Sequence, residues 1–234
     1  MGAADARVLN ETPVRDAASV VLIRDPGGDP KVLMGQRGRK AVFMPNKFVF
    51  PGGRVDPTDA GQPVAGELHA ACRARMAQPG APDPHTLAAA AIRELWEETG
   101  QILGAPGYWP DAPPDWRAFA RRGLRPDPSP LRFVFRAVTP PGPPRRFDAR
   151  FFLADAARLV TDPDDFTDAS DELRHLQWVP VAEARALDLP FVTRAVLAQV
   201  AARLPDLTPP DEVPHFRDGD EARAKARLEQ GYTT

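Results

Sequence analysis

The sequence predicts an α/β fold, in which a mixed β-sheet lies between layers of helices as an α/β/α sandwich. Short apolar runs that end at proline or glycine, as strands do, alternate with segments in which apolar residues recur at helical spacing. Strands interleaved with a few helices favour a sheet covered by helices. At 234 residues and 43% hydrophobic composition, the chain suits one domain with a buried core. We expect that domain over residues 1–207, followed by a polar, proline-rich C-terminal tail over residues 208–234.

The expected elements follow from local composition, taken in order along the chain. Apolar runs ended by turn residues predict strands over residues 17–24, 31–36, 48–50, 131–139, 149–154 and 173–179. Apolar spacing and flanking prolines predict helices over residues 64–78, 84–99, 115–122, 181–187 and 191–204. The second of these helices has the clearest ends, because Asp83 suits its cap, Pro84 its first position and Gly100 the residue after its last turn. Residues 104–130 are expected to be a packed connector, with a substrate lid as the alternative.

Residues 93–100, Arg-Glu-Leu-Trp-Glu-Glu-Thr-Gly, carry the strongest functional signal. On a helix, Glu94, Glu97 and Glu98 fall within an arc of about 100°. Like charges this close repel one another unless a cation lies among them, and Arg93 neutralises only part of the charge. Mg²⁺ or Mn²⁺, which prefer oxygen ligands, would neutralise the rest. The alternative is a solvated acidic helix face.

The upstream residues 48–53, Phe-Val-Phe-Pro-Gly-Gly, read as a strand that ends in a glycine turn. Paired glycines allow close approaches that side chains forbid, so the Gly52 carbonyl could reach a bound ion. Asp56 and Asp59 then bring two more carboxylates onto the exit loop. Strand, glycine turn, acidic loop and acidic helix together resemble the Nudix hydrolase family. Its motif is Gly, five residues, Glu, seven residues, then Arg-Glu-aliphatic-x-Glu-Glu-x-Gly-aliphatic.

The motif matches at both ends but is interrupted. Gly53 takes its first glycine, Asp59 stands where the family has Glu, and Gln101 replaces the last aliphatic residue, with Ile102 next to supply the buried group. The second half matches at Arg93, Glu94, Leu95, Glu97, Glu98 and Gly100. Gly53 and Arg93 lie 40 positions apart (93 − 53), against 14 in the family pattern. The resulting insertion, at about residues 60–82, is similar to that of coenzyme A diphosphatases. Because loop closure entropy grows slowly with length, we expect the insertion to be dispensable for folding but not for substrate choice.

The resemblance implies metal-dependent hydrolysis of the diphosphate linkage of a nucleoside diphosphate derivative. It implies a Mg²⁺ or Mn²⁺ site formed by Gly52, Glu94, Glu97 and Glu98. Catalytic candidates are Glu94, Glu98 and Glu172, the last of which precedes the strand at 173–179, with a plain surface charge as its alternative. Structural roles in the motif are expected for Gly53, Asp59, Arg93 and Gly100.

The substrate is expected to be coenzyme A or an acyl-coenzyme A, and this expectation also comes from resemblance. Arg37 stands where an arginine motif of coenzyme A diphosphatases has its first arginine, although Val42 and Asn46 depart from the rest of that motif. The candidates for binding phosphate oxygens are Arg37, Arg54 and Arg150, each of which could instead be a surface arginine. Phe43, Met44 and the segment with Trp109 and Trp116 could line a trough for the pantetheine arm, or pack in the core.

Other functions stay open at this point. NADH, ADP-ribose or a nucleotide sugar could be the substrate. The chain could also be a non-catalytic Nudix-fold module that binds a nucleotide, although such a module has no need of three mutually repelling glutamates. It could also be mainly an interaction protein, although neither the insertion nor the tail forms a long apolar stripe. A net charge of −2 argues against nucleic acid as a partner.

Compartment and assembly are constrained by the cysteine count and the hydropathy. The single cysteine, Cys72, excludes an internal disulfide and fits a reducing compartment. No apolar run approaches the roughly 20 residues of a membrane span, and the N-terminus lacks a signal-peptide core. We expect a cytoplasmic protein without a membrane partner. Its oligomeric state stays open, and a homodimer is possible.

Overall fold

The computed structural model describes residues 12–39, 44–217 and 219–220. They form an α/β/α sandwich around a mixed sheet, as the sequence predicts. The strands of this sheet are β1 (Val14–Arg24), β2 (Lys31–Arg37), β3 (Phe48–Val49), β4 (Gly52–Arg54), β7 (Arg132–Val138), β8 (Arg146–Asp155), β9 (Leu173–Pro180) and β10 (His215–Phe216). Their order is β10-β7-β8-β1-β2-β3, with β4 also paired to β1 and β9 to β2.

The centre of the sheet is the parallel pair β1–β8, which runs in register from Val14 opposite Arg146 to Ile23 opposite Asp155. Strand β10 also lies parallel to its neighbour, β7, whereas the other pairs are antiparallel. A separate hairpin consists of β5 (Gly104–Pro106) and β6 (Leu124–Pro126).

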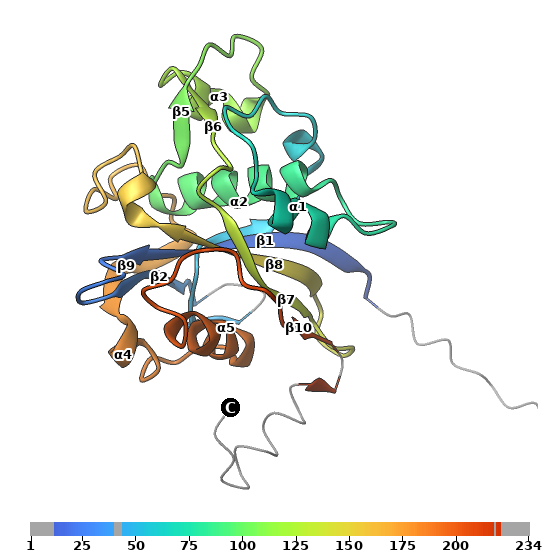
Figure 1. Ribbon diagram of the computed structural model, residues 1–234, viewed down its shortest axis with the longest axis vertical. Coiled ribbons are helices and arrows are strands. Elements are labelled where there is room, and N and C mark those ends of the chain that lie inside the picture. Colours follow the sequence, from blue (N-terminus) through green and yellow to red (C-terminus); the bar gives the residue numbers. More distant parts are fainter. Residues whose placement is uncertain (1–11, 40–43, 218, 221–234) are drawn as a thin grey trace, which may run out of the picture.

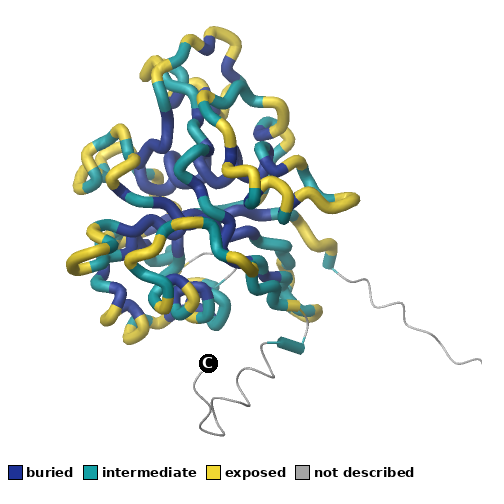
Figure 2. The backbone as a smooth tube through the Cα atoms, viewed as in Figure 1, coloured by how far each residue is buried: buried dark blue, intermediate teal, exposed yellow. Residues whose placement is uncertain are grey.

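Helices cover both faces of the sheet (Figure 1). The longer ones are α1 (Ala70–Met76), α2 (Pro84–Thr99), α3 (Arg117–Ala120), α4 (Val181–Ala184) and α5 (Phe191–Ala201). Single 3-10 turns occur at Pro57–Asp59, Pro114–Trp116 and Ala156–Arg158. Helices α1 and α2 pack on one face and α4 and α5 on the other, so the sheet separates two hydrophobic clusters. Figure 2 shows the buried backbone running through this centre, with exposed loops around it.

Strand β1 is almost entirely apolar in its second half because both of its faces are covered. Ala18, Val20 and Leu22 belong to the cluster under α2. The alternate residues Val21 and Ile23 belong to the cluster under α5, since successive side chains of a strand point to opposite faces.

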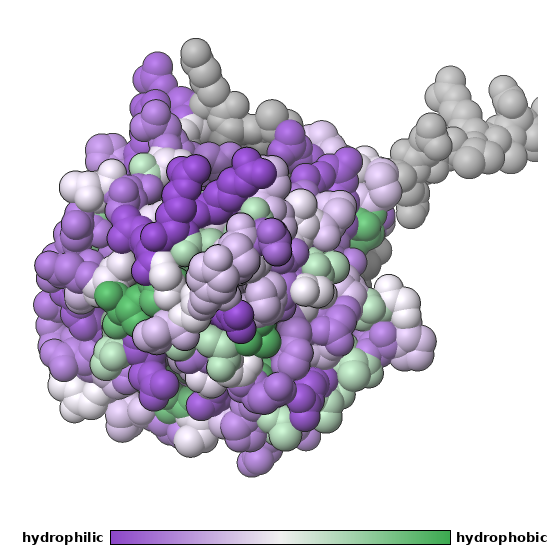
Figure 3. Space-filling view, turned by 90° about the horizontal axis from the view of Figure 1, so that it is seen from above, coloured by the Kyte–Doolittle hydropathy of each residue, from purple (hydrophilic) through white to green (hydrophobic). Residues whose placement is uncertain are grey.

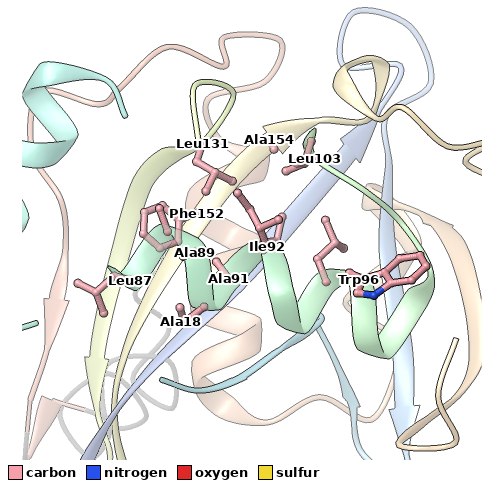
Figure 4. Packing of buried hydrophobic residues seen from close by; sticks show 14 of the residues in the cluster. Ala18, Leu87, Ala89, Ala91, Ile92, Trp96, Leu103, Leu131, Phe152 and Ala154 are labelled. Atoms are coloured by element: carbon pink, nitrogen blue, oxygen red, sulfur yellow. The ribbon is translucent and has the colours of Figure 1, made fainter. Parts of the chain in front are cut away.

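Helix α2 has the ends that the sequence predicts. Asp83 Oδ1 accepts a hydrogen bond from the His85 N–H at 2.8 Å, and Pro84 begins the helix. Gly100 ends it in the left-handed conformation, with φ of 73°, and donates its N–H to the Trp96 carbonyl. Figure 4 shows the apolar side of α2, including Ile92, packed against the sheet. The helix carrying the acidic motif is therefore fixed along its whole length.

The insertion is part of the core, contrary to the expectation that it is dispensable for folding. Its helix α1 is shorter than the predicted helix over residues 64–78. Leu68, Cys72 and Met76 nevertheless bury their side chains almost completely in the same cluster as α2. Because the cost of an insertion includes the contacts that it makes, low closure entropy does not make this one removable.

Replacing Met76 with alanine is therefore expected to lower the free energy of unfolding by about 2–5 kcal/mol, because it leaves a cavity under α2. Urea denaturation would measure the change. Arg73→Ala on the same helix is the control: Arg73 is exposed and pairs with the exposed Glu67, so its loss should cost at most about 1 kcal/mol. Equal midpoints for Met76→Ala and the wild type would contradict the assignment of α1 to the core.

The sheet extends past residue 207, where the sequence analysis places the end of the domain. Strand β10 adds to the sheet beyond residue 207, and Phe216 packs on Phe135 with ring centroids 5.0 Å apart. In the connector, Trp116 is fully buried and lies 5.5 Å from Phe119, ring to ring, so this segment packs on the core. None of the helices in the described ranges is long and apolar enough to cross a bilayer.

Candidate active site

A cleft of about 1190 Å³ opens where α2 meets the glycine turn of β4 and the adjoining ends of β1 and β8. Its lining brings together acidic side chains of α2 and several arginines. The residues that the sequence singles out and that line the cleft are Gly52, Gly53, Arg37, Met44, Arg54, Asp56, Arg93, Glu94, Glu97, Glu98 and Glu172. The two halves of the interrupted motif thus meet in space.

Arg93 joins these halves through a buried network. Its Nε and Nη2 donate to the two carboxylate oxygens of Asp59 at 2.8 and 3.0 Å, and Nη2 also donates to the Arg54 carbonyl at 3.0 Å. Its Nη1 donates to Glu94 Oε1 and Glu97 Oε2, both at 2.9 Å. Arg93 and Asp59 are 3% and 1% exposed, so this pairing lies inside the protein. The contacts favour a bracing role for both residues.

The network keeps Arg93 charged. Burial alone would lower the pKa of its guanidinium, but the hydrogen bonds to Asp59 and the charges of Glu94, Asp59 and Glu97 raise it above its ordinary value. The capping turn at residues 57–59 adds order, because the Asp56 N–H donates to Asp59 Oδ2 at 2.8 Å. Asp59 thus accepts hydrogen bonds both from the backbone of this turn and from Arg93.

Glu94 and Glu98 are too deeply buried for the solvated acidic helix face that the sequence left open as the alternative. Glu94 is 8% and Glu98 only 2% exposed. The β4 turn lies directly against them: the Gly52 N–H donates to Glu98 Oε2 at 2.7 Å, and a Cβ at Gly53 would lie 2.5 Å from the Glu94 carboxyl carbon. Close backbone approach explains why glycine is needed at position 53.

Burial changes the protonation of these carboxylates. Desolvation raises the pKa of Glu98 well above its ordinary value, and the charge of Glu94 adds to this effect, while the Gly52 N–H opposes it. Desolvation likewise raises the pKa of Glu94 to about 7, against the opposing charge of Arg93. The pKa of Glu97 is also raised by burial, with Arg93 again opposing. The nearby arginines, Arg93 and Arg37, therefore offset only part of the effect of burial on these three pKa values.

The donor set suits a hard divalent cation. Each glutamate is engaged by a protein N–H group, and within the described residues no three or more His, Cys, Asp or Glu side chains form a preformed metal cluster. The side chains nevertheless offer only oxygen ligands, and a nearby cation would lower the raised pKa values. The residues present therefore fit a hard divalent cation.

Glu172 reaches the cleft on a loop that is held against α2. The Ser170 N–H donates to the Glu97 carbonyl at 2.9 Å. The same loop is also held further upstream, at Asp162 and Asp165. The buried Gln101, which lies just after α2, donates through Nε2 to the carbonyls of these two residues at 3.1 and 2.8 Å. Gln101, which departs from the family motif, therefore anchors this loop. The adjacent Ile102 is fully buried and supplies the apolar group, as expected.

The three candidate arginines have different surroundings. Arg37 lines the cleft, and its buried Nε has no hydrogen-bond partner among the residues that the structure describes. Arg54 also lines the cleft and forms an ion pair with Asp56. The structure does not bring Arg150 to this cleft, so it is not placed to bind substrate there.

Arg150 is 2% exposed and is held by Asp16 and Asp148. It borders a smaller cavity of about 400 Å³, whereas its neighbours Ala149 and Phe151 line the large cleft. Because alternate residues of a strand point to opposite faces, Arg150 must face away from the cleft.

The structure describes Asn46 and Met44, which lie in and near the partial arginine motif. Asn46 stands at a glycine position and has a left-handed φ of 62°, a conformation that asparagine tolerates better than most residues. Met44 lines the cleft, as expected for a trough, whereas Trp109 and Trp116 are buried in the core instead. Val42 and Phe43 lie outside the described residues.

Sequence analysis missed a second group of cleft residues, which comprises Arg15, Arg145 and Arg146. They are close together because β1 and β8 pair in parallel, with Val14 opposite Arg146. Nothing in the local sequence of either segment indicates this pairing. One signal was available for Arg15. Side chains alternate between the two faces of β1, so Arg15 lies on the same face as Ser19.

Comparison with known proteins agrees with this geometry. The family model for the NUDIX domain matches residues 13–200. Nudix hydrolase 7 of Caenorhabditis elegans is 29% identical over 181 residues, which cover 72% of this chain and 52% of that protein. Acyl-coenzyme A diphosphatase NUDT19 of Gallus gallus is 34% identical over 128 residues, which cover 41% of this chain and 34% of that protein. The chain thus spans about half the length of the first curated relative and about a third of the second.

A solved structure extends the comparison to three dimensions. The NUDIX hydrolase from Alicyclobacillus acidocaldarius is 31% identical, with a TM-score of 0.62 over 82% of this chain and 93% of that chain. The domain match covers most of the sequence, and both halves of its motif meet in the cleft. The chain therefore belongs to the Nudix hydrolase family.

Proposed function

We propose that the protein is a metal-dependent diphosphohydrolase, which cleaves the diphosphate linkage of a nucleoside diphosphate derivative. The observation that carries this proposal is the Arg93 network, which holds Glu94 and Glu97 in one cleft with Glu98 and the Gly52 turn. Burial raises the pKa of all three glutamates, which means that burying their charged forms costs free energy. Packing alone would not need carboxylates at these positions.

The glutamates Glu94, Glu97 and Glu98, with the Gly52 carbonyl, would hold Mg²⁺ or Mn²⁺. When bound, the metal screens the charge of the diphosphate and lowers the pKa of a coordinated water. The chain itself must then accept the proton, and the candidates are Glu94, Glu98 and Glu172. Glu172 differs from the others because it lies on a separate loop, which the hydrogen bond from the Ser170 N–H to the Glu97 carbonyl holds in place.

Arg37 and Arg54 are proposed to orient the diphosphate. Both line the cleft, and the buried Nε of Arg37, which has no hydrogen-bond partner within the described ranges, is a donor suited to a phosphate oxygen. Burial raises the pKa of Glu98, and the charge of Arg37 opposes this effect. Arg37 lines the same cleft as the carboxylates, and we propose that it contacts a substrate held there.

Coenzyme A or an acyl-coenzyme A is the proposed substrate, with NADH, ADP-ribose or a nucleotide sugar as the second candidate. The inserted motif and the acyl-coenzyme A diphosphatase among the relatives support the first. Apolar side chains of the cleft, among them Met44, Val49 and Phe50, would suit a pantetheine arm. We also propose that the protein acts in the cytoplasm, in keeping with its lone, buried Cys72.

A substrate panel tests this proposal: coenzyme A, NADH and ADP-ribose, each with Mg²⁺, Mn²⁺ or EDTA, with products separated by chromatography. We expect EDTA to abolish cleavage, coenzyme A to give the highest kcat/KM, and Arg37→Ala to lower that value roughly 10–100-fold through loss of a charge-assisted hydrogen bond. A preference of roughly tenfold for ADP-ribose that Arg37→Ala leaves unchanged would exclude coenzyme A but retain the hydrolase. Binding without turnover of any compound would favour the non-catalytic module.

A further inference from the structure

One end of the cleft is basic. Arg15 lies in β1, Arg145 just before β8 and Arg146 at its first residue, and all three line the cleft. We call this group the arginine end. Arg15 and Arg145 are exposed, and in the described part of the chain their side chains form no hydrogen bond or ion pair. They are therefore available to an anion.

Arg146 contributes differently, because the backbone around it holds its guanidinium. Its Nε donates to the Thr139 carbonyl at 3.1 Å, and its Nη1 lies 3.5 Å from the Thr12 carbonyl. These contacts hold the guanidinium of Arg146, a residue that follows Arg145 in the chain and lies opposite Val14, the neighbour of Arg15. A partly preorganised set loses less side-chain entropy on binding than three mobile arginines would.

The arginine end lies at a defined distance from the acidic end. Along β1, Ser19 pairs with Gly52, whose N–H binds Glu98. Arg15 precedes Ser19 by four residues on the same face of the strand, which corresponds to about 13 Å between their Cα atoms. A ligand whose diphosphate lies at Glu98 must therefore extend along β1 to reach Arg15.

The floor between the two ends consists of small residues. Ala17 and Ser19 of β1 and Ala149 of β8 all line the cleft, and Gly53 of the turn adjoins them. Phe147 stands beside Arg15 in the register of the sheet and provides an apolar wall. The two charged ends thus line one cleft of about 1190 Å³, with small and apolar side chains between them.

We propose that the arginine end binds a phosphomonoester of the substrate, separate from the diphosphate that is cleaved; this inference rests on the proposed function. A phosphomonoester carries nearly two negative charges and three acceptor oxygens, and guanidinium groups bind such oxygens in pairs. The substrate class is then a nucleoside diphosphate derivative with an additional ribose phosphate, which coenzyme A has and NADH and ADP-ribose lack. Arg15 and Arg145 act as specificity-determining residues.

The opposite charges of the two ends also set the orientation of the substrate. The acidic end accepts a diphosphate only together with a cation, whereas the arginine end accepts an anion directly. A phosphomonoester at the arginine end would therefore direct the diphosphate towards Glu94 and Glu98. Compounds without this group keep their diphosphate contacts but lose the second anchor.

The test compares kcat/KM for coenzyme A and for 3′-dephospho-coenzyme A, which differ only in that phosphate. We expect the wild type to prefer coenzyme A by at least roughly tenfold, mainly through KM. Arg15→Gln and Arg145→Gln should each reduce the preference, and the double variant should bring the ratio close to one. Arg158→Gln is the matched control, because Arg158 is exposed and lies outside the cleft lining; it should keep the wild-type ratio.

Failure of this inference can be told apart from failure of the proposed function. Equal cleavage of the two compounds by the wild type, or a preference that survives in the double variant, would overturn the arginine end and leave the hydrolase intact. If no diphosphate compound is cleaved, the proposed function fails and calorimetry decides. Wild type should then bind adenosine 3′,5′-bisphosphate more tightly than AMP and the double variant should not; equal binding by the wild type overturns the inference.

Discussion

Glu98→Gln is expected to lower turnover roughly 10²–10³-fold, the range seen when one electrostatic contact is removed from an active site. Glu98 lines the cleft with its carboxylate 2.7 Å from the Gly52 N–H, and glutamine keeps an acceptor oxygen for that hydrogen bond. What it loses is the negative charge that would hold a metal ion. Steady-state turnover of the best substrate under saturating Mg²⁺ measures the effect, with the exposed Glu183→Gln as the control. A wild-type rate for Glu98→Gln would show that the active site has been misassigned.

The same variant should not be less stable than the wild type, which separates catalysis from folding. Because the pKa of Glu98 is raised in the folded state, the folded protein retains a proton that the unfolded chain has released above its ordinary pKa of 4.5. The free energy of unfolding therefore falls as pH rises through this range. Glutamine does not ionise, so the variant does not lose this part of the free energy of unfolding as pH rises. In EDTA at pH 8, the variant should therefore melt at a higher temperature than the wild type. At pH 4 the two should melt at nearly the same temperature.

The sequence predicted α2 in full because the information for it is local. Asp83, Pro84 and Gly100 mark its ends, and each interacts with residues within four positions of itself. The acidic motif lies on this helix, so its three glutamates could be grouped without knowledge of the rest of the fold. Their burial could not be predicted, because it depends on the β4 turn: Gly52, which binds Glu98, lies 46 residues away in the sequence.

Arg150 shows where local information ends. The apolar run around it predicts a strand, and strand alternation predicts that Arg150 and Phe151 face opposite ways. Because both faces of this sheet are buried, neither the pattern nor the composition says which face meets the cleft. That choice depends on the pairing of β8 with β1, which brings residues 14–23 beside residues 146–155.

The packing of the insertion on the core, in contrast, is indicated by the sequence. Leu68, Cys72 and Met76 recur every four residues, as expected for a stripe that packs on a core. The low entropic cost of closing a long loop does not argue against such a stripe. Entropy of closure limits what an insertion costs, but it does not determine what the insertion contacts.

Arg93→Met is expected to cost about 3–5 kcal/mol in the free energy of unfolding, because it leaves the carboxylate of Asp59 buried without its partner. Methionine has a similar length and is apolar, so the change removes the charge and the hydrogen bonds with little change in volume. Besides Asp59, the variant loses the bonds to Glu94, Glu97 and the Arg54 carbonyl. Urea denaturation measures the cost, and Arg194→Met on the exposed side of α5 should change the midpoint little.

A second substitution tests whether the buried pair itself is responsible. Asp59→Asn added to Arg93→Met removes the unpaired charge but keeps an acceptor for the Asp56 N–H, so it should recover part of the lost stability. The double variant should therefore be more stable than Arg93→Met alone, and the two changes should be non-additive by about 0.5–3 kcal/mol. Additive effects would mean that Arg93 and Asp59 act independently. In that case the two halves of the motif would be held together by the packing of the β4 turn on α2 and not by this ion pair.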